Sequence, residues 1–412
     1  MTPEPTIDVE IKRMGAQGDG IADTAAGPIY VPFTLPGEHA RVARVGEAGR
    51  VECISHASLD RVAPVCQHFT VCGGCAVQHM SAEFYMRWKR DSVLAAFRAR
   101  GIDADVRPLL VPQGQRRRAV FTATRSDAGV VLGFHQAQSH DLIDLAECPV
   151  LEPRIVQALP GLRVLLKLLL AKRSEVRVTV TMTVAGLDIA VGKLEKPLSL
   201  QLRSELAKHA ADLQIARISI DGDPVYAALT PFLRFGNVDV SVPPGAFIQA
   251  VAAAESEMAR LVIEGLGKAK KVADLFAGVG ALSFPIAARA KVLAVDSDKQ
   301  AIAALADGMR KATGVKPIVT VVRDLFREPL SALELNEHDA IVFDPPRAGA
   351  EAQCKMLAKS KVKTVVAVSC NPATLARDAR ILIDGGFTMA AVTPIDQFHY
   401  TPHVECVTVF QR

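Results

Sequence analysis

The second half of the chain alternates between short apolar runs and longer segments in which apolar residues recur every three or four positions. From about residue 245, runs of five or six residues rich in Val, Ile, Leu and Ala are each followed by an amphipathic segment. Such apolar runs indicate strands buried on both faces, and the segments between them indicate helices. We therefore predict an α/β unit with a doubly wound, Rossmann-like parallel sheet, whose strands cover 271–276, 291–295, 318–322, 339–343, 363–368 and 404–410.

The first sixty residues follow a different pattern. Short β-branched runs over 7–11, 29–33, 40–45 and 50–54 are separated by turns rich in glycine and proline. This spacing predicts a small β-barrel of a kind that often binds RNA.

The middle of the chain mixes both periodicities. Helices are expected over 82–100 and 154–171, and strands over 119–124 and 176–184. We predict three units: a β-barrel over 1–62, an α+β central domain over 63–240, and the parallel-sheet domain over 241–412. The helix over 82–100 is a candidate to pack on the last of these.

Composition narrows the class of protein. Half of the 412 residues are apolar and 22% are charged, which excludes wholesale disorder. The most apolar segment, around 162–171, contains Arg163 and Lys167 and is too short to span a bilayer, and the first residues do not resemble a secretory signal. We expect a cytoplasmic, monomeric protein without a membrane partner. Eight cysteines in a reducing compartment indicate metal binding or catalysis.

Positive charge is concentrated between residues 81 and 125. This stretch has ten Lys or Arg against four Asp or Glu, an excess of six, whereas the whole chain carries only +4. Arg116, Arg117 and Arg118 form its densest part. Such a stretch suits contact with RNA phosphates, and a solvated charged face is an equally good interpretation.

A glycine-rich turn follows the first strand of the parallel sheet, at Gly278 and Gly280. Asp296 ends the next strand eighteen residues after Gly278, where an acid can bind ribose hydroxyls. Ser283 replaces the third glycine of the dinucleotide-binding pattern. The turn therefore indicates a nucleoside-containing cofactor without choosing between a nicotinamide and another kind.

Chemistry-bearing residues follow three later strands, in the segments 344–349 (DPPRAG), 369–378 (SCNPATLARD) and 403–405 (HVE). Cys370 precedes a predicted helix that has Pro372 in its first turn, and the positive end of the helix dipole is expected to favour its thiolate. If the last strand lies antiparallel beside the fifth, Glu405 comes close to Cys370. Considered without these neighbouring segments, Cys370 is interpreted as a buried cysteine at a strand end and Glu405 as a surface acid.

Four further cysteines form a second candidate site: Cys66, Cys72, Cys75 and Cys148. Four thiolates suit either tetrahedral zinc or an iron–sulfur cluster, and the spacing alone does not separate these.

Taken together, these segments resemble the RNA uracil-5-methyltransferases, most closely the iron–sulfur members with an N-terminal TRAM domain that act on 23S rRNA. The resemblance covers nearly the whole chain. It implies a class I methyltransferase fold for the C-terminal sheet, a TRAM-like barrel at the N-terminus, and S-adenosyl-L-methionine as the methyl donor. It also implies a [4Fe–4S] cluster on the four cysteines named above.

The resemblance also implies the roles of single residues. Cys370 corresponds to the nucleophile and Glu405 to the general base, while the cofactor contacts fall on Gln249, Phe276, Asp296 and Asp344. Two positions depart from the family: Ala281 stands where many members have Asn, and Asp296 where Glu is common.

We therefore expect methylation of carbon 5 of a uridine through a covalent Cys370–uracil adduct, with 23S rRNA favoured over tRNA as the substrate. The base must be flipped out of its stack; Phe247 is a candidate to hold it, and Arg347 to bind a uracil carbonyl or a phosphate. The competing hypotheses are an iron–sulfur oxidoreductase and a non-catalytic RNA-binding protein. Neither of them explains the segment 344–349 together with the Cys370–Glu405 pair.

Overall fold

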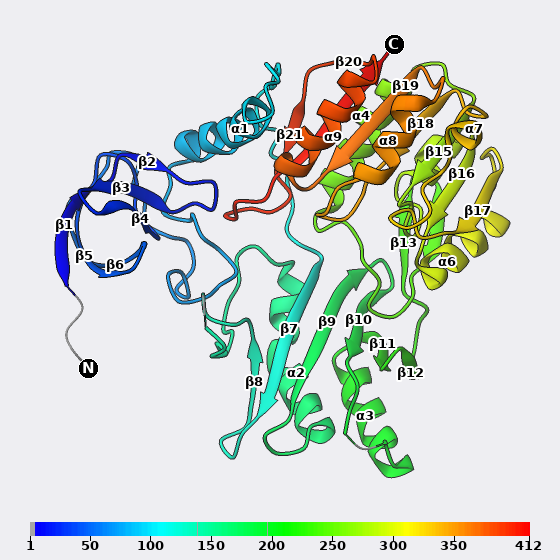
Figure 1. Cartoon of the computed structure of the whole chain (residues 1–412). Coiled ribbons are helices and arrows are strands. Elements are labelled where there is room, and N and C mark those ends of the chain that lie inside the picture. Colours follow the sequence, from blue (N-terminus) through cyan, green and yellow to red (C-terminus); the bar gives the residue numbers. More distant parts are fainter. Residues whose placement is uncertain (1–4, 138, 196) are drawn as a thin grey trace.

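The computed structural model describes residues 5–137, 139–195 and 197–412 and contains three main sheets, each with its own core (Figure 1). The N-terminal sheet, the central sheet and the C-terminal sheet follow one another along the chain. No helix within the described residues is long and apolar enough to cross a membrane.

The N-terminal sheet has six strands in the order β1-β5-β6-β4-β3-β2 and curls around a small core. More buried side chains alternate with exposed ones along β1, β4 and the first half of β5, as expected for a curled sheet with one buried face. The strands are β1 (Thr6–Glu10), β2 (Arg13–Met14), β3 (Gly20–Thr24), β4 (Gly27–Val31), β5 (His39–Val45) and β6 (Ala48–His56).

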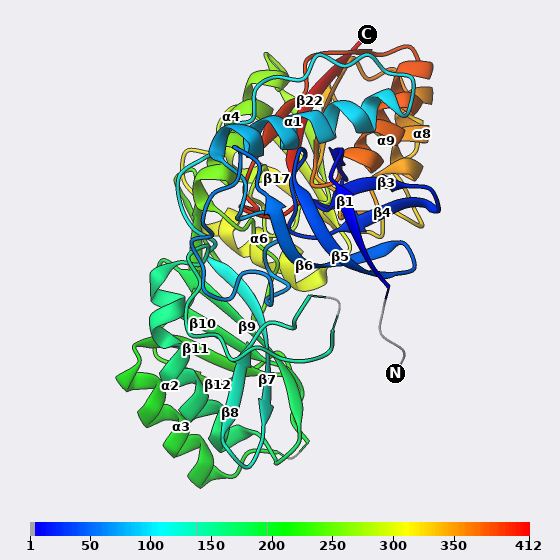
Figure 2. The ribbon, with the colours of Figure 1, turned by 90° about the vertical axis from the view of Figure 1, so that its left-hand side faces the viewer.

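Helix α1 (Ala82–Arg98) leaves this sheet and packs on the C-terminal unit. Its Val93 and Phe97 are fully buried in the same core as Leu375 and Leu382 of helix α9 (Pro372–Asp384). Figure 2 shows α1 lying across the upper unit, beside the N-terminal strands. Helix α1 therefore joins the N-terminal sheet to the C-terminal unit.

The central sheet has the order β12-β11-β10-β9-β7-β8, and helices α2 (Pro153–Leu169) and α3 (Leu200–Asp212) pack on it. A hairpin follows, made of β13 (Phe232–Phe235) and β14 (Val238–Ser241), and its apolar side chains belong to the core of the C-terminal sheet. The strands are β7 (Arg118–Arg125), β8 (Val130–Gly133), β9 (Glu175–Thr183), β10 (Gly186–Val191), β11 (Ile215–Ile220) and β12 (Asp223–Ala227).

The C-terminal sheet confirms the predicted fold class. Five parallel strands have the order β17-β16-β15-β18-β19, and β22 (Glu405–Gln411) inserts antiparallel between β19 and the short β20 (Thr388–Met389). The short β21 (Thr393–Ile395) also pairs with β22. The parallel strands are β15 (Lys271–Leu275), β16 (Lys291–Asp296), β17 (Ile318–Val322), β18 (Ala340–Phe343) and β19 (Thr364–Ser369).

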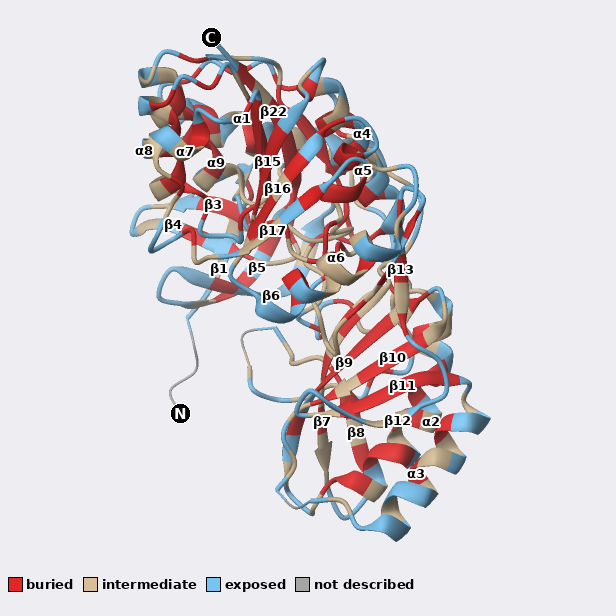
Figure 3. Cartoon of the chain, turned by 90° about the vertical axis from the view of Figure 1, so that its right-hand side faces the viewer, coloured by how far each residue is buried: buried red, intermediate tan, exposed pale blue. Residues whose placement is uncertain are grey.

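Helices cover both faces of this sheet, which explains why its strands are apolar throughout. Figure 3 shows the buried strands between helices whose outer sides are exposed. One core contains side chains of α4 (Ala252–Leu266), α5 (Ser283–Ala287) and α6 (Lys299–Lys311). The other contains side chains of α1, α7 (Ala332–Leu335), α8 (Glu351–Lys359) and α9.

Candidate active site

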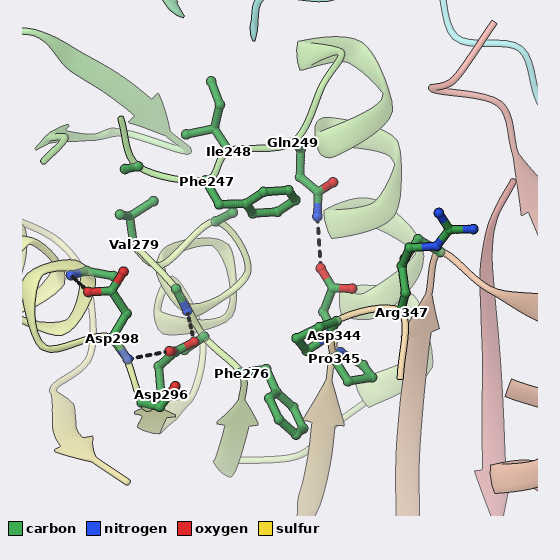
Figure 4. Close-up of a pocket in the computed structure, with 18 of the residues that line it drawn as sticks. Phe247, Ile248, Gln249, Phe276, Val279, Asp296, Asp298, Asp344, Pro345 and Arg347 are labelled. Carbon is green, nitrogen blue, oxygen red and sulfur yellow. Dashed lines mark hydrogen bonds between the residues drawn. The ribbon is translucent and has the colours of Figure 1, made fainter. Parts of the chain in front are cut away.

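A pocket of about 490 Å³ opens at the carboxyl ends of the parallel strands, where ligands bind in open α/β sheets. The structure brings all six predicted catalytic and cofactor-binding residues to its wall: Gln249, Phe276, Asp296, Asp344, Cys370 and Glu405. Figure 4 shows the part of the pocket around Gln249 and Asp344.

The turn after β15 is shaped by unusual backbone angles. Gly278 and Gly280 have φ values of 54° and 97°, and Phe276, which has a side chain, has a φ of 63°. A non-glycine residue in this region is strained, and such residues cluster at functional sites. A Cβ atom at Gly280 would lie 2.7 Å from the ring of Phe284, whereas one at Gly278 would meet no atom within 4 Å. The turn thus leaves open space for a ligand beside Gly278.

The structure explains why a serine occupies the third position of the glycine pattern. The Ser283 hydroxyl is buried and donates a hydrogen bond to Oδ2 of Asp274 at 2.5 Å. Burial raises the pKa of Asp274 to about 7, and its Oδ1 has no partner among the described residues. Ser283 therefore links the helix that follows the turn to β15, the strand that leads into it.

Asp296 holds the same turn from the neighbouring strand. Its Oδ2 accepts from the Gly278 amide at 2.9 Å, and its Oδ1 accepts from the Asp298 amide at 2.8 Å (Figure 4). Each carboxylate oxygen can accept a second hydrogen bond. Asp296 can therefore brace the turn and still bind a ribose hydroxyl.

A chain of four polar side chains crosses the other side of the pocket. Gln249 Nε2 donates to Asp344 Oδ2 at 2.8 Å, and Gln397 Nε2 donates both to Gln249 Oε1 and to Glu405 Oε1, each at 2.7 Å. Gln397 Oε1 accepts from the Ala250 amide at 2.9 Å, which fixes the orientation of the Gln397 side-chain amide. Gln397 is thus a site residue that sequence reasoning missed, because it lies in a loop without periodicity or motif.

Glu405 begins β22 and is almost completely buried, with 2% of its surface exposed. Its Oε2 has no hydrogen-bond partner among the described residues, although it is buried. Burial and the nearby Asp344 raise the pKa of Glu405 to about 8. An unpartnered carboxylate oxygen with this pKa is suited to accept a proton near neutral pH.

Cys370 directly follows β19, and Asn371 caps the helix α9 behind it. Ser369 pairs with Cys406 across β19 and β22, so Cys370 and Glu405 extend from adjacent strand ends. Burial, followed by Glu405 and Asp344, raises the pKa of the Cys370 thiol to about 12, whereas Arg347 lowers it. Burial and two carboxylates therefore oppose the effect expected of the helix N-terminus on the Cys370 thiolate.

Aromatic and basic side chains form the rim. Phe247 is 72% exposed, and the Arg118 guanidinium lies 6.0 Å from the centre of its ring. The Arg347 guanidinium lies 3.3 and 3.4 Å from the two ring nitrogens of His403. His403 was not predicted, although it stands in the segment 403–405. The rim offers both stacking and positive charge to an incoming nucleotide.

The four predicted metal ligands lie in one neighbourhood, on two segments that are tied together. The Gln67 amide donates to Oε1 of Glu147 at 2.7 Å, and the Ala146 amide donates to Nε2 of His68 at 3.2 Å. Burial raises the pKa of Cys66, Cys72, Cys75 and Cys148, and neighbouring thiols raise three of these values further.

Across residues 5–137, 139–195 and 197–412, however, no group of three or more His, Cys, Asp or Glu side chains is arranged to hold a metal ion. The structure therefore brings the cysteines near one another without displaying a metal site, and the cluster stays a prediction.

The densest part of the basic stretch faces inward. Arg116, Arg117 and Arg118 donate to main-chain carbonyls of His399, Gln249 and Ala246, and Arg117 also pairs with Glu255. The described hydrogen bonds of Arg116 and Arg117 are made within the protein, so the hypothesis that these residues bind RNA phosphates stays a prediction.

Comparison with known proteins identifies the class. The tRNA (Uracil-5-)-methyltransferase family matches residues 216–412. Relatives named as uncharacterized RNA methyltransferases from Mesorhizobium japonicum and Brucella suis are 48% and 47% identical, over 98% and 100% of this chain and 97% and 99% of theirs. The 23S rRNA (uracil(1939)-C(5))-methyltransferase RlmD of Halomonas elongata is 31% identical over 98% of this chain and 89% of its own length.

The fold is that of a solved structure. The tRNA (uracil-54, C5)-methyltransferase of Pyrococcus abyssi, solved with S-adenosyl-L-homocysteine, superposes with a TM-score of 0.76 at 23% identity, covering 98% of this chain and 99% of that one. The parallel sheet with its pocket at the strand ends is therefore a Rossmann-like methyltransferase fold. The chain belongs to the RNA uracil-5-methyltransferase family.

Proposed function

We propose that this RNA methyltransferase transfers a methyl group from S-adenosylmethionine to carbon 5 of a uridine in 23S rRNA, through a transient bond between Cys370 Sγ and carbon 6 of the uracil. One observation carries the proposal. Cys370 and Glu405 meet in one pocket from adjacent strands, and the buried Oε2 of Glu405 has no protein partner among the described residues.

The donor set of the pocket fits the cofactor. Apolar side chains line the end near β16 and β17 and suit an adenine ring; they include Phe276, Val279, Leu325 and Phe326. Asp296 can accept ribose hydroxyls, and Gln249 has one amide proton that no described group accepts. When bound, S-adenosylmethionine supplies the electrophilic methyl group.

The residues of the chain perform the remaining chemistry. Carbon 5 of uracil is a poor nucleophile. When Cys370 loses its proton and adds to carbon 6, the displaced electron pair forms an enolate and carbon 5 becomes nucleophilic. After carbon 5 has gained the methyl group, Glu405 Oε2 removes the carbon-5 proton. The electron pair re-forms the C5–C6 double bond and expels the Cys370 thiolate, so that the enzyme is regenerated.

Ribosomal RNA is the proposed substrate because the relative from Halomonas elongata, named for 23S rRNA, aligns with 98% of this chain, including the N-terminal sheet. The alternative is a uridine in tRNA, which the description of the matching family favours. Labelled methyl transfer to 23S rRNA and tRNA transcripts separates the two. Absence of transfer to either transcript would refute the proposed activity.

The four cysteines are proposed to hold a [4Fe–4S] cluster. Four thiols are the usual ligands of such a cluster. All four are free, they lie on two linked segments, and the pKa values of Cys75 and Cys148 are raised by neighbouring thiols of the set. An anaerobic preparation should contain iron and sulfide, and Cys72→Ser should remove both, while Cys53→Ser, an exposed cysteine on β6, should not. Stoichiometric zinc without iron would refute the cluster.

A further inference from the structure

Three consecutive arginines, Arg116 to Arg118, connect the central sheet to the walls of the pocket. Arg118 begins β7, Arg117 lies in a bend before it, and Arg116 forms an isolated bridge with Leu151. Because the chain bends between Arg116 and Arg118, the three neighbouring side chains can reach different parts of the surrounding structure. Here each reaches a segment that builds the pocket.

Arg117 fixes the main chain on both sides of the Gln249–Ala250 peptide. Its Nε donates to the Gln249 carbonyl at 3.1 Å, and its own amide donates to the Ala250 carbonyl at 2.8 Å. Its Nη2 donates to Oε2 of Glu255 at 2.6 Å, and the two side chains are only 11% and 9% exposed. This buried, charge-assisted pair holds the guanidinium in one orientation.

Arg118 and Arg116 hold the neighbouring parts of the pocket. Arg118 donates to the carbonyls of Gly245 and Ala246 at 3.3 and 3.1 Å, just before Phe247. Arg116 donates to the His399 carbonyl at 3.0 Å, in the loop that carries Gln397. The contacts of Arg118 fix the main chain just before the Gln249 segment, and the contact of Arg116 fixes the loop that precedes Glu405.

The arginine segment is itself anchored at its other side, beside the turn that follows Cys148. Gln115 Nε2 donates to the Pro149 carbonyl at 3.0 Å, and the Arg116 amide donates to the Val150 carbonyl at 2.8 Å. The segment from Gln115 to Arg118 is therefore hydrogen-bonded through both its main chain and its side chains, and we call it the arginine strut.

We propose that Arg116, Arg117 and Arg118 are positioning residues that set the two polar walls of the pocket. Arg117 and Arg118 hold the segment of Gln249, and Arg116 holds the loop of Gln397. The inference rests on the proposed function, in which Gln249 binds the cofactor and Glu405 is the base. The planar fork of arginine suits this task, because it bonds a carbonyl and a carboxylate at once, which lysine does less well.

The test measures binding of S-adenosyl-L-homocysteine by calorimetry to the parent protein and to Arg117→Ala, Gln249→Ala and the double variant. We expect Arg117→Ala to weaken binding about 10-fold, the loss for one well-placed charge-assisted hydrogen bond. In the Gln249→Ala background the same change should cost less than about 2-fold, because residues that act together are not additive. Equal losses in both backgrounds, or no loss, would overturn the inference.

Arg125→Ala is the matched control. Arg125 is the last residue of β7, the strand that begins next to Arg117, and it donates to two carbonyls, those of Lys167 and Leu170, away from the pocket. Its removal should leave binding unchanged. If Arg117→Ala does not fold, Arg117→Lys replaces it, since it keeps the charge beside Glu255 and loses the fork; undiminished affinity in this variant would equally count against the strut.

A second measurement separates the strut from an RNA contact. Arg116→Ala should lower kcat at saturating cofactor without changing affinity for S-adenosyl-L-homocysteine, because it acts on the catalytic loop. The salt dependence of binding to a 23S rRNA transcript should keep its slope, whereas each lost phosphate contact reduces the slope by about 1. A flattened slope would overturn the inference. Failure of the parent protein to bind S-adenosyl-L-homocysteine would overturn the proposed function as well.

Discussion

Replacing Glu405 by glutamine removes the base while keeping the geometry of the site. Glu405 Oε1 accepts from Gln397 Nε2 at 2.7 Å, and a glutamine can keep this bond with its carbonyl oxygen. Its NH₂ group then takes the place of Oε2, which has no partner among the described residues. Glu405→Gln should therefore fold as the parent protein does, and lose only the ability to take a proton.

The expected loss follows from the step that is removed. A positioned base contributes about 10²–10⁴-fold to a rate, which corresponds to about 3–5 kcal/mol in the barrier. Cys370 can still attack and carbon 5 can still gain its methyl group, but the carbon-5 proton remains and the thiolate cannot leave. The variant should accumulate a protein–RNA complex that survives denaturation and carries one labelled methyl group.

Denaturing gels of the reaction with methyl-labelled S-adenosylmethionine detect this complex. Cys370→Ala should give neither product nor complex, whereas Cys354→Ala, a buried cysteine on α8 outside the pocket, should behave as the parent enzyme does. If Glu405→Gln turns over at the parental rate and leaves no resistant complex, Glu405 is not the base.

Four further results are expected. Gln397→Ala should lower turnover more than cofactor affinity, because the Glu405 carboxylate loses its only described hydrogen bond. Pre-steady-state product release measures this effect, and an unchanged release rate would show that Gln397 does not position Glu405. Lys89 of α1 and Asp396 form a fully buried ion pair, with 2.6 Å between Nζ and Oδ1. Lys89→Met should cost about 3–5 kcal/mol in urea unfolding, because it leaves Asp396 buried without its cation; a loss below about 1 kcal/mol would contradict this. Methylation should rise from pH 6 to pH 9, because Glu405 has a pKa of about 8 and works ionised. The raised pKa favours folding fully below about pH 4.5 and loses this contribution as pH rises through 8, so the parent should lose stability relative to Glu405→Gln over that range; a flat difference would contradict the assignment.

The catalytic sheet was predictable because its strands are buried on both faces and are therefore apolar throughout. All six predicted strands are present within a residue or two. The short β20 and β21 were not predicted, since two or three residues at the sheet edge carry no period. The hairpin β13–β14 was not recognised either, as its burial depends on the distant helix α6.

The candidate site was predictable where it lies at strand ends, because parallel strands bring their carboxyl ends to one edge. Asp344, Cys370 and Glu405 converge for this reason. Gln397 meets Gln249 across 148 positions of the chain, and no local pattern encodes such a contact. The internal hydrogen bonds of Arg116, Arg117 and Arg118 could not be predicted, because composition gives the charge of a segment and does not show whether a carbonyl lies within reach.

The pKa of Cys370 shows what the thiol must overcome before it attacks the uracil. A helix N-terminus stabilises an anion by about 0.3–1 kcal/mol, which is less than one pKa unit. Burial, Glu405 and Asp344 raise the pKa of the thiol from 9.0 to about 12, well beyond that compensation. A pKa in this range favours the thiol over the thiolate, which is the form that attacks and is oxidised, so the proton must leave before the sulfur adds to the uracil. Glu405 lines the same pocket and its Oε2 has no partner among the described residues. It can take one proton in each cycle, and in the proposed reaction this is the carbon-5 proton, so the thiol proton passes to solvent. The same burial thus has two effects: it raises the pKa of Cys370 and so disfavours its thiolate, and it raises the pKa of Glu405 and so makes this carboxylate a stronger base.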